Sequence, residues 1–301
     1  MGLNREVSGR LVVALLGVLL VVAACGSDPE PPRPPAQAAG QEYVNLGDSY
    51  ASGTGVDPLQ QDSPFFCQRS AGDYARIVAA RTGRVLTDVS CARATTKHLD
   101  TAQYDGVPPQ LDALSDETGL VTLMLGGNDN GTFGTSVSVC GKAAKTDPSG
   151  SPCTDGAGAG LLGPIDAETY PALVGGLREI RERAPNADIL IIGYPWIMPA
   201  TGGCYPDMPI AEGDVPFMRE LQTRLNSAVS RAAAKAGVTY VDMSKVSDGH
   251  DACAPEGVRW VEPQSNRSAS ANLFGGLHPN AAGQRAIAEQ VLAALNRRSG
   301  G

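Results

Sequence analysis

Five short apolar segments, each of strand length, constrain the fold of this chain more than any other feature. They are Glu42–Leu46, Val85–Val89, Leu120–Leu125, Ile189–Ile192 and Val238–Val241. Helical patterns, with apolar residues at every third or fourth position, alternate with them and cover Tyr74–Ala80, Tyr170–Arg183, Phe217–Val229 and Ala281–Leu295. Short apolar strands separated by helices indicate a parallel sheet covered on both faces. The sequence therefore predicts one α/β domain, in which ligands bind beyond the carboxyl ends of the strands.

The overall composition fits a folded domain and argues against one class of partner. The 301 residues are 42% hydrophobic and 19% charged, which is typical of a packed core and not of disorder. The formal net charge is −8. Because phosphate binding requires clustered Lys and Arg, we expect no nucleic-acid partner.

The N-terminal segment has the pattern of an export signal. Arg5 and Arg10 precede an apolar run, Leu11–Ala24, that is too short to cross about 30 Å of hydrocarbon comfortably. The run ends in Val-Ala-Ala-Cys-Gly, which resembles a bacterial lipobox with Cys25 as the lipidated residue. We expect a signal peptide over residues 1–24, a lipid-anchored Pro-rich tether over 25–41 and the folded domain over 42–301. The protein would then lie on the extracytoplasmic face of the membrane; a plain cleaved secretory signal, giving a secreted protein, is the alternative.

The cysteines support an exported protein with disulfides. The chain has seven Cys, and lipidation of Cys25 leaves an even number. The remaining ones are Cys67, Cys91, Cys140, Cys153, Cys204 and Cys253. Sequence alone allows about fifteen pairings, and we favour the sequential one because each pair would join neighbouring loops. No Cys-x₂-Cys spacing is present, so we expect no metal site.

Several other residues have two interpretations from sequence alone. The Gly- and Ser-rich region 130–165 is either irregular surface or, as we favour, a partly ordered wall of the substrate cleft. Trp196 or Trp260 could line an apolar pocket. His250 lies in a polar cluster that is conceivable as a metal site, although a loop histidine held by hydrogen bonds is the simpler interpretation. His98 is expected at the surface or behind the site.

Four polar segments follow strand ends or precede the last helix. They are Gly47-Asp48-Ser49, residues 90–96, Gly126-Gly127-Asn128-Asp129 and Leu277-His278-Pro279-Asn280. Each alone is a common turn or helix cap. Together, at the carboxyl ends of strands of one parallel sheet, they predict a single site containing a serine, an asparagine and a histidine.

This order of segments resembles the SGNH (GDSL-type) hydrolase superfamily, and specifically its exported, disulfide-bearing actinobacterial esterase and lipase branch. The resemblance covers essentially the whole mature domain and implies a flavodoxin-like three-layer α/β/α sandwich around a five-stranded parallel sheet. It implies that Ser49 is the nucleophile and His278 its general base. The oxyanion hole would comprise the backbone N–H groups of Ser49 and of the second-segment residue, together with the Asn128 amide. It also implies an acyl-ester substrate, no cofactor and a monomer.

The sequence departs from the family pattern at two positions. Arg93 stands where the family has a glycine; its backbone N–H can still donate, and its side chain could bind an anionic or polyol group or simply lie at the surface. Gly275 stands where the family has the aspartate that orients the histidine. We therefore expect a Ser49–His278 dyad oriented by a main-chain carbonyl near Gly275. A remote Asp48 or Asp129 is the alternative, although Asp48 is better explained as support for the nucleophile turn.

The resulting hypothesis is a serine esterase or lipase, and two others remain beside it. The same acyl-enzyme could serve a cell-envelope glycan acyltransferase or deacetylase. A non-catalytic ligand-binding lipoprotein is the third. The Gly-Asp-Ser turn also resembles the nucleophile elbow of α/β-hydrolases, but that fold places several strands before the serine and here only one precedes it.

Overall fold

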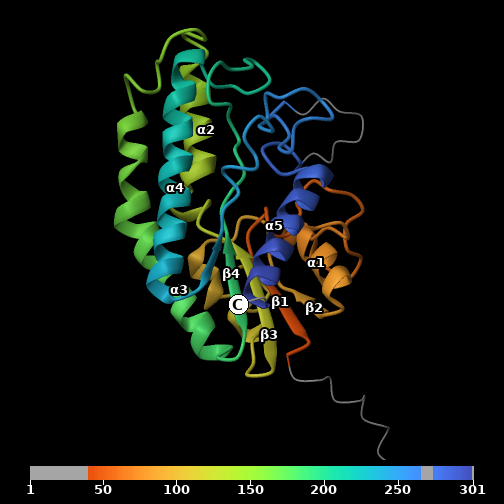
Figure 1. The fold of residues 1–301 in the computed structure, drawn as a ribbon. Helices are drawn as coiled ribbons and strands as arrows, with labels where there is room; N and C mark the ends of the chain where they lie inside the picture. Colours follow the sequence, from red (N-terminus) through yellow and green to blue (C-terminus); the bar gives the residue numbers. More distant parts are fainter. Residues whose placement is uncertain (1–39, 266–273, 300–301) are drawn as a thin grey trace, which may run out of the picture. The chain divides into compact units, whose positions relative to one another are not determined.

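A sheet of five parallel strands crosses the part of the chain that the computed structural model describes, residues 40–265 and 274–299 (Figure 1). The strands are β1 (Glu42–Gly47), β2 (Val85–Asp88), β3 (Thr118–Met124), β4 (Asp188–Ile192) and β5 (Thr239–Val241). Their order across the sheet is β2-β1-β3-β4-β5. In this flavodoxin-like order the chain changes direction between β1 and β3, and ligands bind in the crevice at that point.

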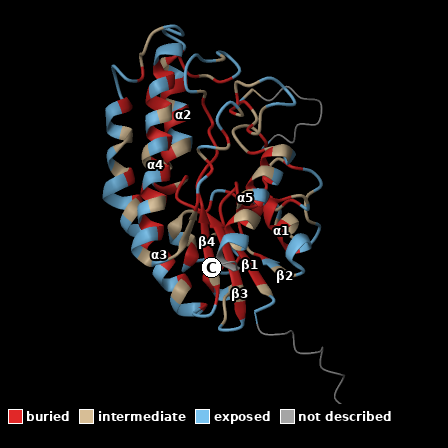
Figure 2. Ribbon diagram, in the orientation of Figure 1, coloured by how far each residue is buried: buried red, intermediate tan, exposed pale blue. Residues whose placement is uncertain are grey.

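Burial explains why these segments are strands. Almost every residue of β1, β3 and β4 is buried, as expected for central strands with helices on both faces. β2 lies at the edge of the sheet and is partly exposed. The few polar side chains inside the sheet bond to one another; the Tyr43 hydroxyl, for example, lies 2.7 Å from Thr122 Oγ1. Figure 2 shows the buried residues concentrated in the strands and on the helix faces turned toward them.

Helices cover the sheet in two groups. On one face α1 (Tyr74–Thr82) packs against α5 (Ala281–Ser299), and on the other α3 (Tyr170–Arg183) packs against α4 (Val215–Ala236) (Figure 1). Local sequence sets their ends. The Asp73 side chain caps α1 by accepting from the Arg76 N–H at 2.8 Å. Gly83 and Gly237 end α1 and α4 in the left-handed conformation that glycine adopts most easily.

The predicted fold is confirmed, with strand and helix ends shifted by a few residues from the sequence patterns, except that α4 extends further at its carboxyl end. The main departure is α2 (Thr132–Ala143), an unpredicted helix inside region 130–165, for which we favoured a partly ordered wall of the cleft over irregular surface. Its sequence contains glycines and β-branched residues, which favour helix weakly. Buried Val137 and Cys140 pack it onto the core, so tertiary contacts override local propensity.

Three disulfides fix the loops around the sheet, and they are the sequential pairs. Cys67 pairs with Cys91, Cys140 with Cys153, and Cys204 with Cys253. The first joins the segment before α1 to the segment after β2. The second closes α2 onto the chain that follows it.

The expected signal peptide, Cys25 and the tether up to residue 39 lie outside the described residues. Among the residues that are described, no helix combines the length and apolar character needed to cross a bilayer.

Candidate active site

The turn after β1 positions Ser49 and depends on a glycine. Gly47 has a φ of 120°, and a Cβ there would lie 2.2 Å from the Met124 carbonyl oxygen of β3. The buried Gln110 side chain holds this glycine from both sides: it accepts from the Gly47 N–H at 2.7 Å and donates to the Gly47 carbonyl at 3.0 Å. The Asp48 N–H donates to the Met124 carbonyl at 2.9 Å. Ser49 is therefore held at the carboxyl ends of β1 and β3.

Asp48 supports this turn from below. Its buried carboxylate accepts from the Tyr50 N–H at 2.9 Å and from the Tyr194 hydroxyl at 2.6 Å. The same hydroxyl accepts from the Gly127 N–H at 2.8 Å, so Asp48 links the turn that carries Ser49 to the Gly-Gly-Asn-Asp segment after β3. Burial raises the pKa of Asp48 to about 7, although hydrogen bonds from Tyr194 and Tyr50 oppose the shift.

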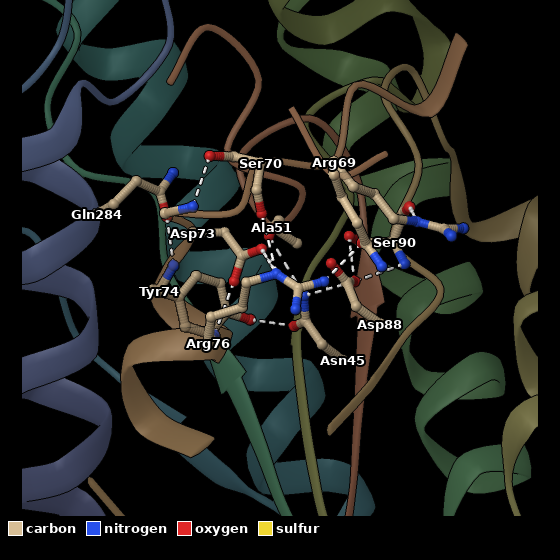
Figure 3. A network of polar contacts seen from close by, with 12 residues as sticks. Asn45, Ala51, Arg69, Ser70, Asp73, Tyr74, Arg76, Asp88, Ser90 and Gln284 are labelled. Carbon is tan, nitrogen blue, oxygen red and sulfur yellow. Dashed lines mark hydrogen bonds and ion pairs between the residues drawn. The ribbon is translucent and has the colours of Figure 1, made fainter. Parts of the chain in front are cut away.

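A buried polar network holds the next residues of the turn (Figure 3). The Asn45 amide donates to the Ala51 carbonyl at 3.3 Å and to Asp88 Oδ1 at 3.0 Å. The Gln284 amide of α5 donates to the Tyr50 carbonyl at 3.1 Å. Strand β1 and helix α5 thus fix the main chain directly after Ser49 through side-chain bonds.

One cavity of about 370 Å³ contains every residue expected to do chemistry: Ser49, Arg93, Asn128 and His278 all line it. The apolar lining of this cavity was not predicted from the sequence. That lining includes Tyr50, Phe65, Phe66, Tyr104, Phe133 and Phe274. The pair Phe65-Phe66, directly before Cys67, was the one sequence feature that could have indicated an apolar lining.

His278 is held by main-chain groups. Its Nδ1 lies 2.8 Å from the Gly276 carbonyl oxygen, one residue after the expected Gly275. A carbonyl only accepts, so Nδ1 carries the proton and Nε2 presents its lone pair. Burial lowers the pKa of His278 to about 4, and hydrogen bonds to the Gly276 and Phe274 carbonyls offset this only in part.

No carboxylate within residues 40–265 and 274–299 bonds to the His278 ring. The Asp129 carboxylate instead accepts two hydrogen bonds from Thr96, one from the Thr96 backbone N–H at 3.2 Å and one from the Thr96 hydroxyl. The Glu262 carboxylate belongs to a segment paired with His278, but it bonds to Arg259 at 2.9 Å and to the Asn280 amide at 2.8 Å. No hydrogen bond joins Ser49 Oγ to His278 in this part of the chain either, and such contacts commonly tighten only when substrate binds.

Three hydrogen-bond donors of the cavity lining retain an unbonded hydrogen. In the described ranges the backbone N–H groups of Ser49 and Arg93 have no partner. The Asn128 amide uses one hydrogen on the Ala94 carbonyl, at 3.0 Å, and keeps the second. Donors that the protein itself leaves free on a cavity wall that also contains a serine can bind an oxyanion.

Backbone strain is concentrated around this cavity. Three of its lining residues are non-glycines with left-handed φ: Gln68 at 51°, Arg93 at 68° and Leu277 at 66°. Each such residue costs about 1–2 kcal/mol. Arg93 thus adopts the conformation that a glycine would favour at this position. The Leu277 carbonyl accepts from the Tyr50 hydroxyl at 2.5 Å, which fixes the strained residue beside the histidine.

Other expected residues lie elsewhere. The suggestion that Trp196 or Trp260 lines the cavity is wrong, since neither is among its described lining residues. Trp196 donates to the Ser244 carbonyl and carries the Arg219 guanidinium 3.5 Å above its ring. Trp260 stacks on His250, whose Nδ1 lies 2.6 Å from the Val258 carbonyl. His98 accepts from the Thr95 N–H and caps the short helix behind Arg93.

Region 130–165 contributes to the cavity wall through α2. Phe133 and Gly134, at the start of that helix, line the cavity. Across the described residues, no group of three or more His, Cys, Asp or Glu side chains could hold a metal ion.

The sequence and the fold match known proteins. The model of the GDSL-like Lipase/Acylhydrolase family matches residues 46–286. Lipase 2 of Streptomyces coelicolor is 45% identical, over 95% of this chain and 97% of that protein. The crystal structure of phospholipase A1 from Streptomyces albidoflavus superimposes with a TM-score of 0.72 and 27% identity, over 85% of this chain and 99% of that one. That of the extracellular lipase from Streptomyces rimosus gives a TM-score of 0.70 and 25% identity, over 84% and 99%.

Proposed function

The chain belongs to the GDSL-like lipase/acylhydrolase family, and on that premise we propose that it is a serine esterase or lipase acting through an acyl-enzyme on Ser49. One observation carries the proposal: Ser49, His278 and three donors with unbonded hydrogens line a single cavity. The cavity lining is rich in aromatic side chains, which suits an ester with an apolar acyl group.

In the proposed mechanism, His278 Nε2 takes the proton from Ser49 Oγ as that oxygen attacks the ester carbonyl. The carbonyl oxygen gains negative charge and accepts from the Ser49 and Arg93 N–H groups and the Asn128 amide. When the tetrahedral intermediate collapses, the C–O bond to the alcohol breaks and His278 returns the proton to the leaving oxygen. Water then attacks the acyl-enzyme by the same route and releases the acid.

In this proposal a dyad replaces the usual triad. The Gly276 carbonyl fixes the tautomer and the orientation of His278, the task that a buried carboxylate performs in a triad. A carbonyl dipole stabilises the imidazolium less than a full negative charge does. The base consequently stays neutral over a wider range of acidic pH, in keeping with its lowered pKa.

The proposal extends to location. We infer that residues 1–24 are a signal peptide, that Cys25 carries the lipid, and that residues 25–41 tether the domain of residues 42–301 to the extracytoplasmic face of the membrane. Three disulfides support export, because such bonds persist in oxidising compartments. Mass spectrometry of the mature N-terminus tests the lipid, since an unmodified Cys25 would contradict it.

Activity-based labelling tests the proposed chemistry. A fluorophosphonate should label the wild-type protein on Ser49 and leave Ser49→Ala unlabelled. A panel of esters from C2 to C18 chains then defines acyl preference, and product analysis separates hydrolysis from transfer to a sugar hydroxyl. A folded wild-type protein that neither takes the label nor turns over any ester would be a binding lipoprotein, and the proposal would be wrong.

A further inference from the structure

Three phenylalanines form an exposed cluster, here called the aromatic rim: Phe65, Phe66 and Phe274. Their side chains are 61%, 65% and 48% exposed, and no other large apolar residue in the described ranges exceeds 45%. The three rings pack edge to face, with centroids 6.0 Å apart for Phe65 and Phe66 and 6.1 Å apart for Phe65 and Phe274. A contiguous exposed apolar patch of this kind marks an interaction surface.

The rim forms part of the lining of the Ser49 cavity. All three rim residues line that cavity together with Ser49 and His278. Phe66 also packs on Tyr104, at 5.4 Å between ring centroids, and Tyr104 is a lining residue too. The exposed rings and the candidate nucleophile thus belong to the same opening.

Two of the rim residues, Phe65 and Phe66, are held in their exposed position. Phe65 and Phe66 precede Cys67, whose disulfide to Cys91 joins them to the segment that contains Arg93. The Ala92 N–H donates to the Cys67 carbonyl at 3.0 Å, and the Gln68 amide donates to the Phe65 carbonyl at 2.7 Å. The disulfide and these hydrogen bonds hold the main chain of this segment, so Phe65 and Phe66 are presented at the surface of the described domain.

We propose that the aromatic rim docks on a lipid surface and that the esters hydrolysed at Ser49 are acyl chains presented in that surface. This inference rests on the proposed esterase function. A protein partner seated on the rim would close the cavity, whereas a lipid layer supplies the substrate itself. The polar groups around the opening suit an ester headgroup, because Arg93 is exposed and forms no ion pair among the described residues.

The net charge of the chain cannot supply affinity for an anionic lipid surface. With a net charge of −8 the chain has no general attraction to anionic membranes, so insertion of rings has to supply the affinity. The chain between the proposed lipid site at Cys25 and the first described residue, Gly40, can reach at most about 50 Å. Because the tether joins the domain at the amino end of β1, the end of the sheet away from the cavity, this reach is needed for the rim to turn back toward the membrane that holds the anchor.

The experiment places a fluorescent probe in the rim. The full chain carries Ser49→Ala, so that no lipid is consumed, together with Phe66→Trp. The matched control carries Ser49→Ala and Val85→Trp, because Val85 is 45% exposed and lies at the amino end of β2, the end of the sheet away from the cavity. Both are mixed with phosphatidylcholine–phosphatidylglycerol vesicles whose acyl chains are plain or brominated. The emission of Ser49→Ala alone is subtracted for the two native tryptophans.

Brominated chains should lower the emission of the Phe66→Trp probe by about twofold, because interfacial apolar groups reach the acyl boundary. The Val85→Trp probe should change little. Absence of quenching at Phe66→Trp, or equal quenching at both sites, would overturn the proposal. So would a rim emission that shifts with protein concentration in lipid-free buffer, since that result assigns the rim to a second copy of the chain.

A kinetic comparison gives an independent readout. Phe65→Ser/Phe66→Ser should lower kcat/KM for vesicle phospholipid about tenfold more than for a short soluble ester, because it removes two buried rings from the docked state. The control Val85→Ser/Val258→Ser should not lower kcat/KM for vesicle phospholipid more than it lowers kcat/KM for the short soluble ester. Equal losses on both substrates would mean that the rim only shapes the cavity, and docking would be excluded. Loss of fluorophosphonate labelling at Ser49 would refute the proposed function, whereas the quenching result uses an inactive chain and stands apart from it.

Discussion

The turn that carries Ser49, the proposed nucleophile, and the segment that carries His278 face the same cavity but are held in different ways. Around Ser49, side-chain hydrogen bonds hold the turn: Gln110 bonds both main-chain groups of Gly47, and the Asp48 carboxylate accepts from Tyr50 and Tyr194. Around His278, main-chain bonds predominate: the Leu277 N–H donates to the Glu262 carbonyl at 2.9 Å, and the Glu262 N–H donates to the His278 carbonyl at 3.0 Å. The Tyr50 hydroxyl adds one side-chain bond, to the Leu277 carbonyl. The ring itself is oriented by the Gly276 carbonyl.

This difference explains what each region can tolerate. A side-chain network is broken by a single substitution, whereas a main-chain acceptor remains whatever the side chain is. Close packing adds a constraint on the histidine segment, since a Cβ on Gly55 would lie 2.4 Å from the Gly275 Cα. The segment is therefore packed directly against the loop that follows the nucleophile turn, and Gly275 lies where that packing is closest.

The largest effect is expected when either member of the proposed dyad is removed. Ser49→Ala and His278→Ala should each lower kcat for a p-nitrophenyl ester by about 10⁴-fold or more, because one supplies the nucleophile and the other the base. Asp129→Asn serves as the control for a hidden triad and should retain most activity. If Asp129→Asn lost its activity while circular dichroism showed that it remains folded, a carboxylate would be required.

A smaller loss is expected at the oxyanion donor. Asn128→Ala should lower kcat by about 10²–10³-fold with little change in KM, because the lost hydrogen bond strengthens only in the transition state. Steady-state kinetics on one soluble ester measure it. A rise in KM with unchanged kcat would place Asn128 in ground-state binding instead.

The turn that carries Ser49 should make the stability of the protein depend on pH through Asp48. Burial raises the pKa of Asp48 from 3.8 to about 7, so between these values the folded state holds a proton that the unfolded state has released. Stability from Asp48 is therefore complete below pH 3.8 and falls as the pH rises to about 7. Asp48→Asn should remove up to about 1.4 kcal/mol per pH unit of this slope. Urea unfolding from pH 4.5 to 7 checks it; parallel curves for the two proteins would contradict it.

The smallest effect is expected at Arg93. Arg93→Gly relieves a left-handed φ of 68° and should raise the unfolding free energy by up to about 1 kcal/mol. Because the donor there is a main-chain N–H, activity should fall far less than in Asn128→Ala. A loss as large as that of Asn128→Ala would show that the guanidinium itself acts on the substrate.

The contrast between the two regions also explains what could be predicted from sequence. Strand and helix positions follow from apolar spacing. The place of four polar segments after strands or before the last helix predicts one shared site, and the family resemblance singled out Ser49, Asn128 and His278 within them. Asp48 could be assigned to the turn because its side chain makes the contact. The acceptor for His278 could be placed only near Gly275. Every residue has a main-chain carbonyl, so the residue types do not show which carbonyl accepts the hydrogen bond. Helix α2 and the aromatic lining were missed because tertiary packing, and not local propensity, places them.

The central claim is that His278 works without a carboxylate, and its own titration tests this most directly. The chain has three histidines, so ¹⁵N-histidine NMR with His278→Gln as an assignment control can follow the ring from pH 3 to 8. Burial beside a carbonyl should keep the pKa of His278 at about 4, and the acid limb of kcat/KM should lie there as well. A pKa at or above the ordinary value of 6.5 would require a partner with negative charge and would contradict the dyad.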